Sequence, residues 1–155
     1  METKTIAVGY IRVSTAAQAH EGESLHTQRQ AIEDYCRGHG LELAEIYTDE
    51  GISGKKQKRP GLEAVLNAAR KREIGGVIVT RLTRFGRSAR DLLNNLGVLE
   101  ENGVNLISLK ENIDTSTPAG RLMRTVLAGI AEFEHETIKD QMHENRNVRW
   151  SQNRV

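Results

Sequence analysis

The order of apolar and polar positions divides most of the chain into short strands and helices. Apolar runs that predict strands cover residues 5–11, 76–80 and 104–109, and residues 41–48 alternate between apolar and polar positions as in a strand. Apolar residues three and four positions apart predict helices between them, over residues 24–38, from Pro60 through Ala69, and over residues 88–102. This alternation predicts an α/β fold with a mostly parallel central sheet and helices on both of its faces.

Capping residues and loops give the expected bounds of these elements. Ser24 is a candidate N-cap of the first helix, Pro60 suits the first turn of the second, and Gly103 ends the third. Residues 49–59 (DEGISGKKQKR) are rich in Gly, Lys and Ser, so we expect a loop there, with Asp49 inside it.

From Pro118 onward the pattern turns helical again, and the expected helix is too long for a small globular domain. If it continues to about Trp150, it extends for about 50 Å, whereas a globule of this chain length is about 40 Å across. Its first half is apolar almost all round, so one stripe can pack on the core and the rest needs another surface. We interpret residues 118–155 as a long C-terminal oligomerisation helix that continues from an α/β core of residues 1–117. A wholly intradomain core helix is the alternative.

Composition excludes several classes of protein. The chain has 155 residues, of which 37% are hydrophobic and 28% charged, as expected of a folded domain. The lone cysteine, Cys36, cannot form an internal disulfide. No apolar run approaches the roughly 20 residues needed to cross a bilayer. We therefore expect a cytoplasmic protein with no membrane partner.

Charge is unevenly distributed, although the net charge is only +1. Residues 55–90 contain eleven Lys and Arg against two Glu, so this segment carries +9 and the rest of the chain −8. Solvated helix surfaces would explain much of this run. Arg81, Arg84 and Arg87 are different because they follow a strand directly at a spacing of three, and we interpret them as candidates for binding a polyanion.

Polar and charged residues follow the first three predicted strands. They are Arg12-Val13-Ser14, Asp49-Glu50 and residues 81–87. Ligands of open parallel sheets bind beyond the carboxyl ends of the strands. If the three strands are neighbours, a hydroxyl, a carboxylate and several guanidinium groups meet at one edge. Because guanidinium donors match phosphate oxygens, this set favours a phosphate-containing ligand.

Four motifs within residues 5–142 carry a resemblance to a known family. They are Tyr10-Ile11-Arg12-Val13-Ser14-Thr15 with Gln18, Ser24-Leu25 and Gln28; Thr48-Asp49-Glu50-Gly51-Ile52-Ser53-Gly54; Arg81-Leu82-Thr83-Arg84-Phe85-Gly86-Arg87-Ser88; and Asn112-Ile113-Asp114-Thr115-Ser116 with Gly120 and Ala131-Glu132-Phe133-Glu134. In this order and spacing they resemble the motifs of the serine recombinases, which comprise resolvases, invertases and serine integrases. The long gap between Ser14 and Gln28 is more similar to the large serine integrases than to the small resolvases.

The resemblance implies the catalytic domain of a site-specific DNA recombinase. Ser14 would attack a DNA phosphodiester to form a 5′-phosphoserine intermediate, followed by strand exchange and religation without ATP. Arg12, Arg84 and Arg87 would neutralise the phosphorane, and Asp49 would hold an arginine or relay a proton. These motifs do not identify the group that removes the serine proton. The supporting, DNA-phosphate-binding positions are Tyr10, Gln18, Gln28, Ser53 and Arg81.

Four of these residues also have purely structural interpretations. Tyr10 would serve as core filling, Gln28 as an exposed polar residue, Asp49 as a helix or turn cap, and Ser53 as a plain loop residue. Both interpretations stay open at the level of the sequence.

Three positions depart from the family pattern. Thr83 stands where Asp is common, and His135 and Gln141 stand where Arg is common. These departures support a second hypothesis, a catalytically impaired oligomerisation or DNA-tethering module of the same fold.

Cofactors are not implied, but macromolecular partners are. The five histidines show no paired ligand spacing, so we expect no metal. No GxxxxGK loop occurs, and we expect no other cofactor. The implied partners are double-stranded DNA and further copies of the chain, as a homodimer and as a tetramer in the active synaptic complex. No helix-turn-helix is recognisable after Trp150, so we expect a catalytic domain without its DNA-binding domain, of bacterial, phage or mobile-element origin, that acts in DNA recombination or integration.

Overall fold

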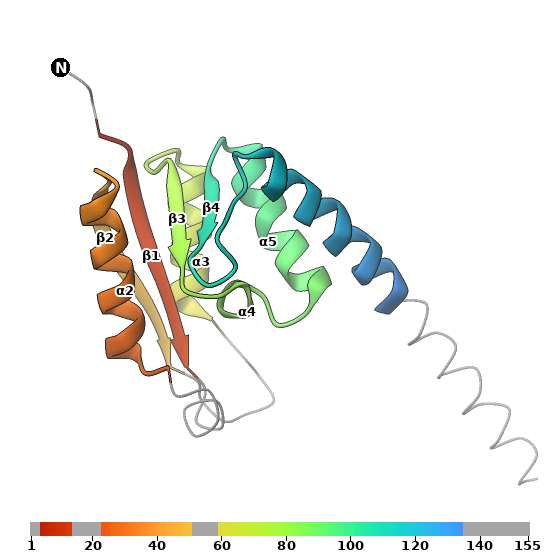
Figure 1. Ribbon diagram of the computed structural model, residues 1–155, viewed down its shortest axis with the longest axis horizontal. Coiled ribbons are helices and arrows are strands. Elements are labelled where there is room, and N and C mark those ends of the chain that lie inside the picture. The colour runs from red at the N-terminus through yellow and green to blue at the C-terminus, as the bar shows by residue number, and fades with distance from the viewer. Residues whose placement is uncertain (1–3, 14–22, 51–58, 135–155) are drawn as a thin grey trace, which may run out of the picture.

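The computed structural model describes residues 4–13, 23–50 and 59–134, and a central sheet organises them (Figure 1). Within these residues the sheet has five strands in the order β2-β1-β3-β4-β5. They are β1 (Ile6–Val13), β2 (Glu42–Glu50), β3 (Gly76–Val79), β4 (Asn105–Ser108) and β5 (Ile113–Asp114). β1 to β4 run parallel, and β5 pairs antiparallel with β4. The predicted mostly parallel sheet is confirmed, and β5 is an addition.

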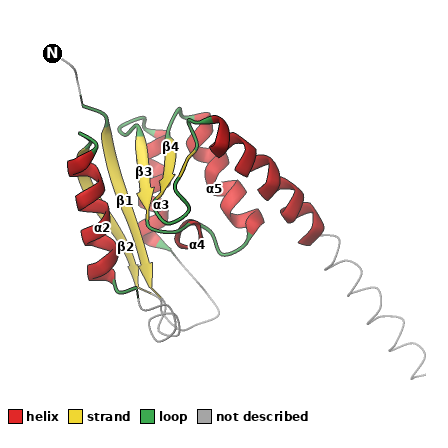
Figure 2. Ribbon diagram, in the orientation of Figure 1, coloured by secondary structure: helices red, strands yellow, loops and turns green. Residues whose placement is uncertain are grey.

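Helices cover both faces of the sheet, as predicted (Figure 2). α2 (Leu25–Gly38) packs on one face, and α3 (Pro60–Arg70) and α5 (Ala89–Glu101) lie on the other. The core beneath α2 is the smaller one, and its buried residues are Ala7, Ile11, Ile32, Cys36 and Ile78. The core beneath α3 and α5 is larger because both helices contribute apolar stripes, among them Leu62, Val65, Leu66, Ala69, Leu92, Leu96 and Leu99. Full burial of each large aliphatic side chain stabilises the fold by about 1.5–3 kcal/mol.

The helix ends use the residues that the sequence indicates. The Ser24 hydroxyl accepts a hydrogen bond from the Thr27 main-chain N–H at 3.1 Å. Ser88 caps α5 in the same way, a role that was not predicted. α3 begins at Pro60, whose missing N–H costs nothing in a first turn. Gly103 follows α5 with a φ of +69°, a conformation that favours glycine.

Two local predictions differ from the structure. β2 continues to Glu50, so Asp49 lies in a strand and not in the expected loop. The reason is pairing, because Asp49 stands opposite Arg12 in the parallel register of β1 and β2. Within residues 81–87, where no helix was predicted, a single helical turn forms α4 (Leu82–Phe85).

Residues 118–134 form the described part of the long helix (Figure 1). Leu127 packs against the larger core. Four other apolar side chains on this helix are exposed: Leu122 (66%), Val126 (53%), Ile130 (44%) and Phe133 (68%). The expected continuation to Trp150 lies outside the described residues. Among the residues the structure describes, no helix is long and apolar enough to cross a membrane.

Candidate active site

Sheet topology brings the three predicted polar segments to one edge. β1 lies between β2 and β3, and all three strands run parallel. Their carboxyl ends therefore meet, which confirms that the strands are neighbours. Arg12 near the end of β1, Asp49 near the end of β2 and Arg84 just beyond β3 consequently share one region of the molecule.

The centre of this edge is a cluster of guanidinium groups. Burial lowers the pKa of Arg12, and the positive charges of Arg87, Arg84 and Arg59 lower it further, against an opposing effect of Tyr10. Arg84 is almost completely buried, with 4% of its surface exposed. Like charges at short range in a partly dehydrated site are unfavourable unless an anion joins them. The cluster is therefore suited to binding a phosphate.

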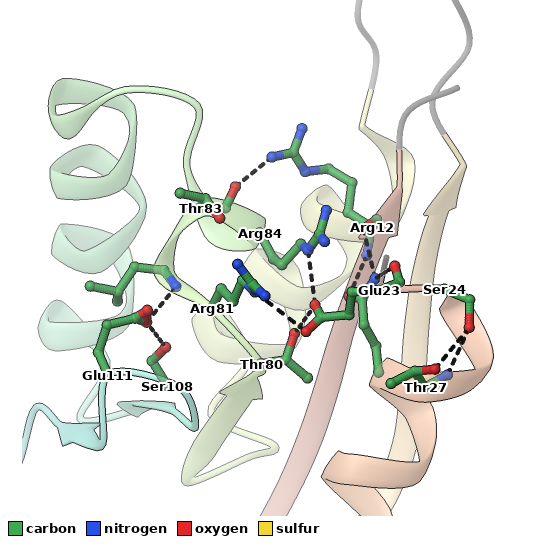
Figure 3. A network of polar contacts seen from close by, with 12 residues as sticks. Arg12, Glu23, Ser24, Thr27, Thr80, Arg81, Thr83, Arg84, Ser108 and Glu111 are labelled. Carbon is green, nitrogen blue, oxygen red and sulfur yellow. Dashed lines mark hydrogen bonds and ion pairs between the residues drawn. The ribbon is translucent and has the colours of Figure 1, made fainter. Parts of the chain in front are cut away.

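Arg12 is oriented by the turn that follows β3. Its Nη2 donates a hydrogen bond to the main-chain oxygen of Thr83 (Figure 3). Its Nε is buried and has no hydrogen-bond partner among the described residues. Thr83, the position that departs from the family pattern, thus contributes through its main chain, which any residue at this position can provide.

Gln28 clamps the end of β1 from α2. Its side chain is fully buried, so the exposed interpretation is wrong. Its Nε2 donates to the main-chain oxygen of Arg12 at 3.0 Å, and its Oε1 accepts from the Arg12 N–H at 3.3 Å. These two bonds fix the main chain two residues before Ser14 in the sequence.

Asp49 holds the start of α3. Its side chain is buried, and its carboxylate accepts hydrogen bonds from the Gly61 N–H at 2.7 Å and the Leu62 N–H at 3.0 Å. It also accepts from the Tyr10 hydroxyl at 2.6 Å. These contacts support the cap interpretation. A Cβ on Gly61 would come within 2.9 Å of the carboxylate, so only glycine allows this approach.

Tyr10 combines core packing with one buried polar contact. Its ring meets Phe85 edge to face, with centroids 6.2 Å apart. Burial, and then the hydrogen bond to Asp49, raise the pKa of the Tyr10 phenol far above its ordinary value. The hydroxyl therefore stays protonated and acts as a donor to Asp49.

The short helix α4 carries Arg84 and is held from both ends. Glu111 accepts a hydrogen bond from the Leu82 N–H at 2.9 Å at its start. Asn95 on α5 donates to the Phe85 main-chain oxygen at 2.7 Å at its end. A single turn is not stable alone, so these two side chains give Arg84 a defined position.

Sequence reasoning missed two acidic residues of this region. Asp91 accepts two hydrogen bonds from Arg59, at 2.6 and 3.0 Å, and one from the Arg87 N–H at 3.0 Å. Glu23 accepts from the segment after β3, including Arg81 and Arg84. No local signal marks the contacts of Asp91 with Arg59 or of Glu23 with Arg81 and Arg84, because these partners are 32 or more positions apart in the sequence.

A pocket of about 320 Å³ lies between the long helix and the segment that joins α4 to α5, which carries Arg87. Thr83 and Arg87 line one side, and Leu127 and Glu134 of the long helix line the other. The site and the helix are thus neighbours, with room between them for a side chain.

The remaining predicted residues lie outside the described parts of the chain. Ser14, Gln18 and Ser53 belong to this group. Within residues 4–13, 23–50 and 59–134, no three His, Cys, Asp or Glu side chains are grouped to hold a metal ion.

The fold and the cluster define an α/β domain with a guanidinium-rich edge beside a long helix, and comparison with known proteins gives its family. A family model described as the N-terminal domain of resolvases matches residues 7–155. A DNA-invertase of Escherichia phage P1 is 36% identical over 148 residues, which are 96% of this chain and 72% of that protein.

Solved structures agree with this match. A resolvase family site-specific recombinase from Streptococcus pneumoniae is 32% identical with a TM-score of 0.84, over 96% of this chain and 99% of that one. The N-terminal catalytic domain of TP901-1 integrase is 36% identical with a TM-score of 0.73, over 85% of this chain and 98% of that one. The chain belongs to the resolvase family and has the fold of a site-specific recombinase catalytic domain. It spans from 59% to 72% of the length of the first five curated relatives that it matches.

Proposed function

We propose that this chain cleaves and rejoins double-stranded DNA, with Ser14 as the nucleophile. The serine Oγ loses its proton and bonds to phosphorus while the bond from phosphorus to the 3′ oxygen breaks. The 3′ oxygen takes up a proton, and the 5′ phosphate remains on the serine. Attack by a 3′-hydroxyl on this phosphoserine reverses the step and rejoins the strand, so no external energy source is needed.

The guanidinium cluster is the observation that carries this proposal. Arg12, Arg84 and Arg87 lie at the carboxyl edge of the sheet, and Ser14 follows Val13, the last residue of β1, directly in the sequence. A phosphorane gains negative charge as it forms, and fixed cations that need no rearrangement stabilise it. Arg81, Gln18 and Ser53 are proposed to support DNA phosphate binding around this centre.

Asp49 acts in this proposal by positioning and not by proton transfer. Gly61, Leu62 and Tyr10 already donate hydrogen bonds to its two carboxylate oxygens. Releasing the carboxylate to take the serine proton would leave three buried donors unsatisfied. Tyr10 and Gln28 likewise hold the frame of the site, through Asp49 and through the Arg12 main chain.

The long helix is proposed to join copies of the chain. Residues 1–117 would form the catalytic core, and residues 118–155 the interface helix of a homodimer that pairs into a tetramer for strand exchange. Leu122, Val126, Ile130 and Phe133 support this because they recur at helical spacing on one exposed side.

The proposal is tested by trapping the covalent intermediate. A library of end-labelled duplexes, each with a nick that lets the cleaved end diffuse away, is incubated with the protein and resolved on a denaturing gel. We expect a labelled protein–DNA adduct, located at Ser14 by peptide mass spectrometry, and none with Ser14→Ala. The conservative variant Arg84→Lys should form the adduct about 100-fold more slowly, because lysine lacks the planar guanidinium that can donate two hydrogen bonds to a phosphate.

Two results would overturn the proposal. One is an adduct that survives Ser14→Ala at the wild-type rate. The other is DNA binding by the wild type with no adduct on any duplex, which would favour the DNA-tethering module.

A further inference from the structure

Glu23 borders the arginine cluster through its contact with Arg84, and the serine recombinase motifs assign it no role. It stands between the end of β1 and α2 in the sequence, immediately before the cap residue Ser24. Its carboxylate accepts hydrogen bonds from the Thr80 hydroxyl at 2.6 Å, from Arg84 Nε at 3.3 Å and from Arg81 Nε at 3.4 Å (Figure 3). All three donors come from the segment at the end of β3, more than 50 positions away.

Burial makes these contacts stronger than ordinary surface pairs. The side chains of Arg84 and Glu23 are only 3% and 15% exposed. A buried guanidinium needs an anion, because desolvation of an unpaired charge is costly. Arg84 also lies close to Arg12, whose charge adds to this need. Glu23 supplies the anion from within the chain.

The geometry of the contact favours orientation of Arg84 over blocking of it. The bond to Nε uses one of the five N–H donors of a guanidinium, on the side of the group nearest its own stem. Thr80, itself 4% exposed, holds the carboxylate in place from the end of β3. The chain of contacts from Thr80 through Glu23 to Arg84 therefore holds the guanidinium from its Nε side.

We propose that Glu23 is a positioning residue for Arg84. It orients the Arg84 guanidinium and balances its charge, so that Arg84 can stabilise the phosphate in the transition state. This inference rests on the proposed function, in which Arg84 stabilises the phosphorane. The opposite role is a carboxylate that occupies the phosphate position and must leave before DNA binds. The two roles predict opposite effects of removing the charge. A positioning residue is needed for the rate, whereas a competitor suppresses DNA binding and the rate.

The variants Glu23→Gln, Glu23→Ala and Glu23→Asp separate these roles. Glu42→Gln is the matched control, because Glu42 is exposed at the amino end of β2 and its change alters the net charge equally. The rate constant of adduct formation is measured at saturating duplex, and the Kd for the same duplex is measured separately. We expect Glu23→Gln and Glu23→Ala to lower the rate constant about 100-fold with Kd almost unchanged. Glu23→Asp keeps the charge and should recover part of the rate.

A second readout does not depend on catalysis. Slow exchange of the Arg84 Nε–H with water is followed by NMR, with the signal assigned through its loss in Arg84→Lys. We expect a protected signal in the wild type and in Glu42→Gln, and an unprotected one in Glu23→Ala.

The outcomes distinguish the inference from the function on which it rests. Adduct formation at the wild-type rate or faster in Glu23→Gln, or a protected Arg84 signal in Glu23→Ala, overturns the positioning role. If the wild type forms no adduct, the proposed function fails. Loss of the Arg84 signal in Glu23→Ala would then still establish that Glu23 orients this arginine.

Discussion

The side chains at the carboxyl edge of the sheet find partners within the chain, whereas many of those on the helix of residues 118–134 do not. At the edge, buried charges meet partners within the chain. Asp49 meets two main-chain N–H groups and Tyr10, Asp91 meets Arg59, and Glu23 meets Arg84. On the helix, four large apolar side chains are 44–68% exposed. Most of the buried charges in the first region are thus paired within one copy of the chain, whereas the apolar side chains of the second are uncovered among the described residues.

This difference indicates which properties one copy of the chain can have alone. An internally paired edge keeps its arginines oriented before any ligand arrives, so no reorganisation is needed when charge develops. An exposed apolar face gains free energy only when another surface covers it. We therefore expect substitutions at the edge to change stability and cleavage in an isolated copy, and substitutions on the helix to change assembly.

The largest effect is expected at the contact that holds α3. Asp49→Ala removes the acceptor of two buried main-chain N–H groups and of the Tyr10 hydroxyl. Each buried donor left unsatisfied costs about 1–3 kcal/mol, so we expect the free energy of unfolding to fall by about 4 kcal/mol. Urea denaturation followed by circular dichroism measures this.

Tyr10→Phe is the matched control for Asp49. It removes one donor and leaves the carboxylate bonded to Gly61 and Leu62, so a loss of about 1 kcal/mol is expected. A loss below 1 kcal/mol in Asp49→Ala would contradict the capping role and return Asp49 to the candidates for proton transfer.

Sequence patterns predicted the fold wherever the signal was local. The apolar run of β3, the hydroxyl of Ser24 and the proline that begins α3 each act within a few residues. β5 was missed because it has only two residues, too few to show the alternation of apolar and polar positions that indicates a strand. α4 was missed because its single turn is held by Glu111 and Asn95, which are remote in the sequence.

In the candidate site, too, sequence patterns predicted some contacts and missed those that depend on residues remote in the sequence. The ends of neighbouring parallel strands were expected to meet, and this predicted that Arg12 and Arg84 lie close together. The structure brings both into one cluster. The pairing of Glu23 with Arg84 spans 61 positions and depends on side-chain packing that no sequence period encodes. The assigned roles of Ser14, Gln18 and Ser53 stay predictions, because these residues lie outside the described parts of the chain.

The helix provides the second largest expected effect. Ile130→Glu places a charge in the exposed apolar stripe, which the proposed dimer would bury. A central apolar contact of an interface contributes about 2 kcal/mol or more, so we expect the dimer Kd to rise about 100-fold. Sedimentation over a range of concentrations measures this rise.

Ala128→Glu serves as the control for the helix. Ala128 is exposed and faces away from the stripe of Leu122, Val126 and Phe133 at 3.6 residues per turn. Equal dissociation by both variants, or a monomeric wild type at high concentration, would contradict the proposed interface.

A smaller effect, which depends on pH, is expected for the ion pair of Arg59 and Asp91. The hydrogen bonds from Arg59 lower the pKa of Asp91, so this carboxylate stabilises the fold above its unfolded pKa of about 3.9. The stabilisation is lost as the pH falls through the lower folded pKa. Asp91→Asn should therefore lower the free energy of unfolding by about 2 kcal/mol at pH 7.

The pH dependence separates this charge effect from a change in packing. Urea denaturation of the wild type and Asp91→Asn at pH 7 and at pH 3 should show the difference between them shrink at the lower pH. If the difference in unfolding free energy is the same at both pH values, the packing of the Asp91 side chain, and not its charge, stabilises the contact between Arg59 and α5.

The smallest effect is expected where the long helix meets the C-terminal end of α5. Arg124 on the long helix pairs with Glu100 on α5 at 2.7 Å, almost the same length as the 2.6 Å pair of Arg59 and Asp91. Its side chains are 46% and 37% exposed, against 21% and 25% for the other pair. Solvent and salt screen the exposed pair, so a double-mutant cycle of Arg124→Ala and Glu100→Ala should give a coupling energy of about 0.5 kcal/mol or less. A coupling above 1 kcal/mol that persists in high salt would show that this pair fastens the helix to α5, and the helix would then belong to the internally satisfied part of the molecule.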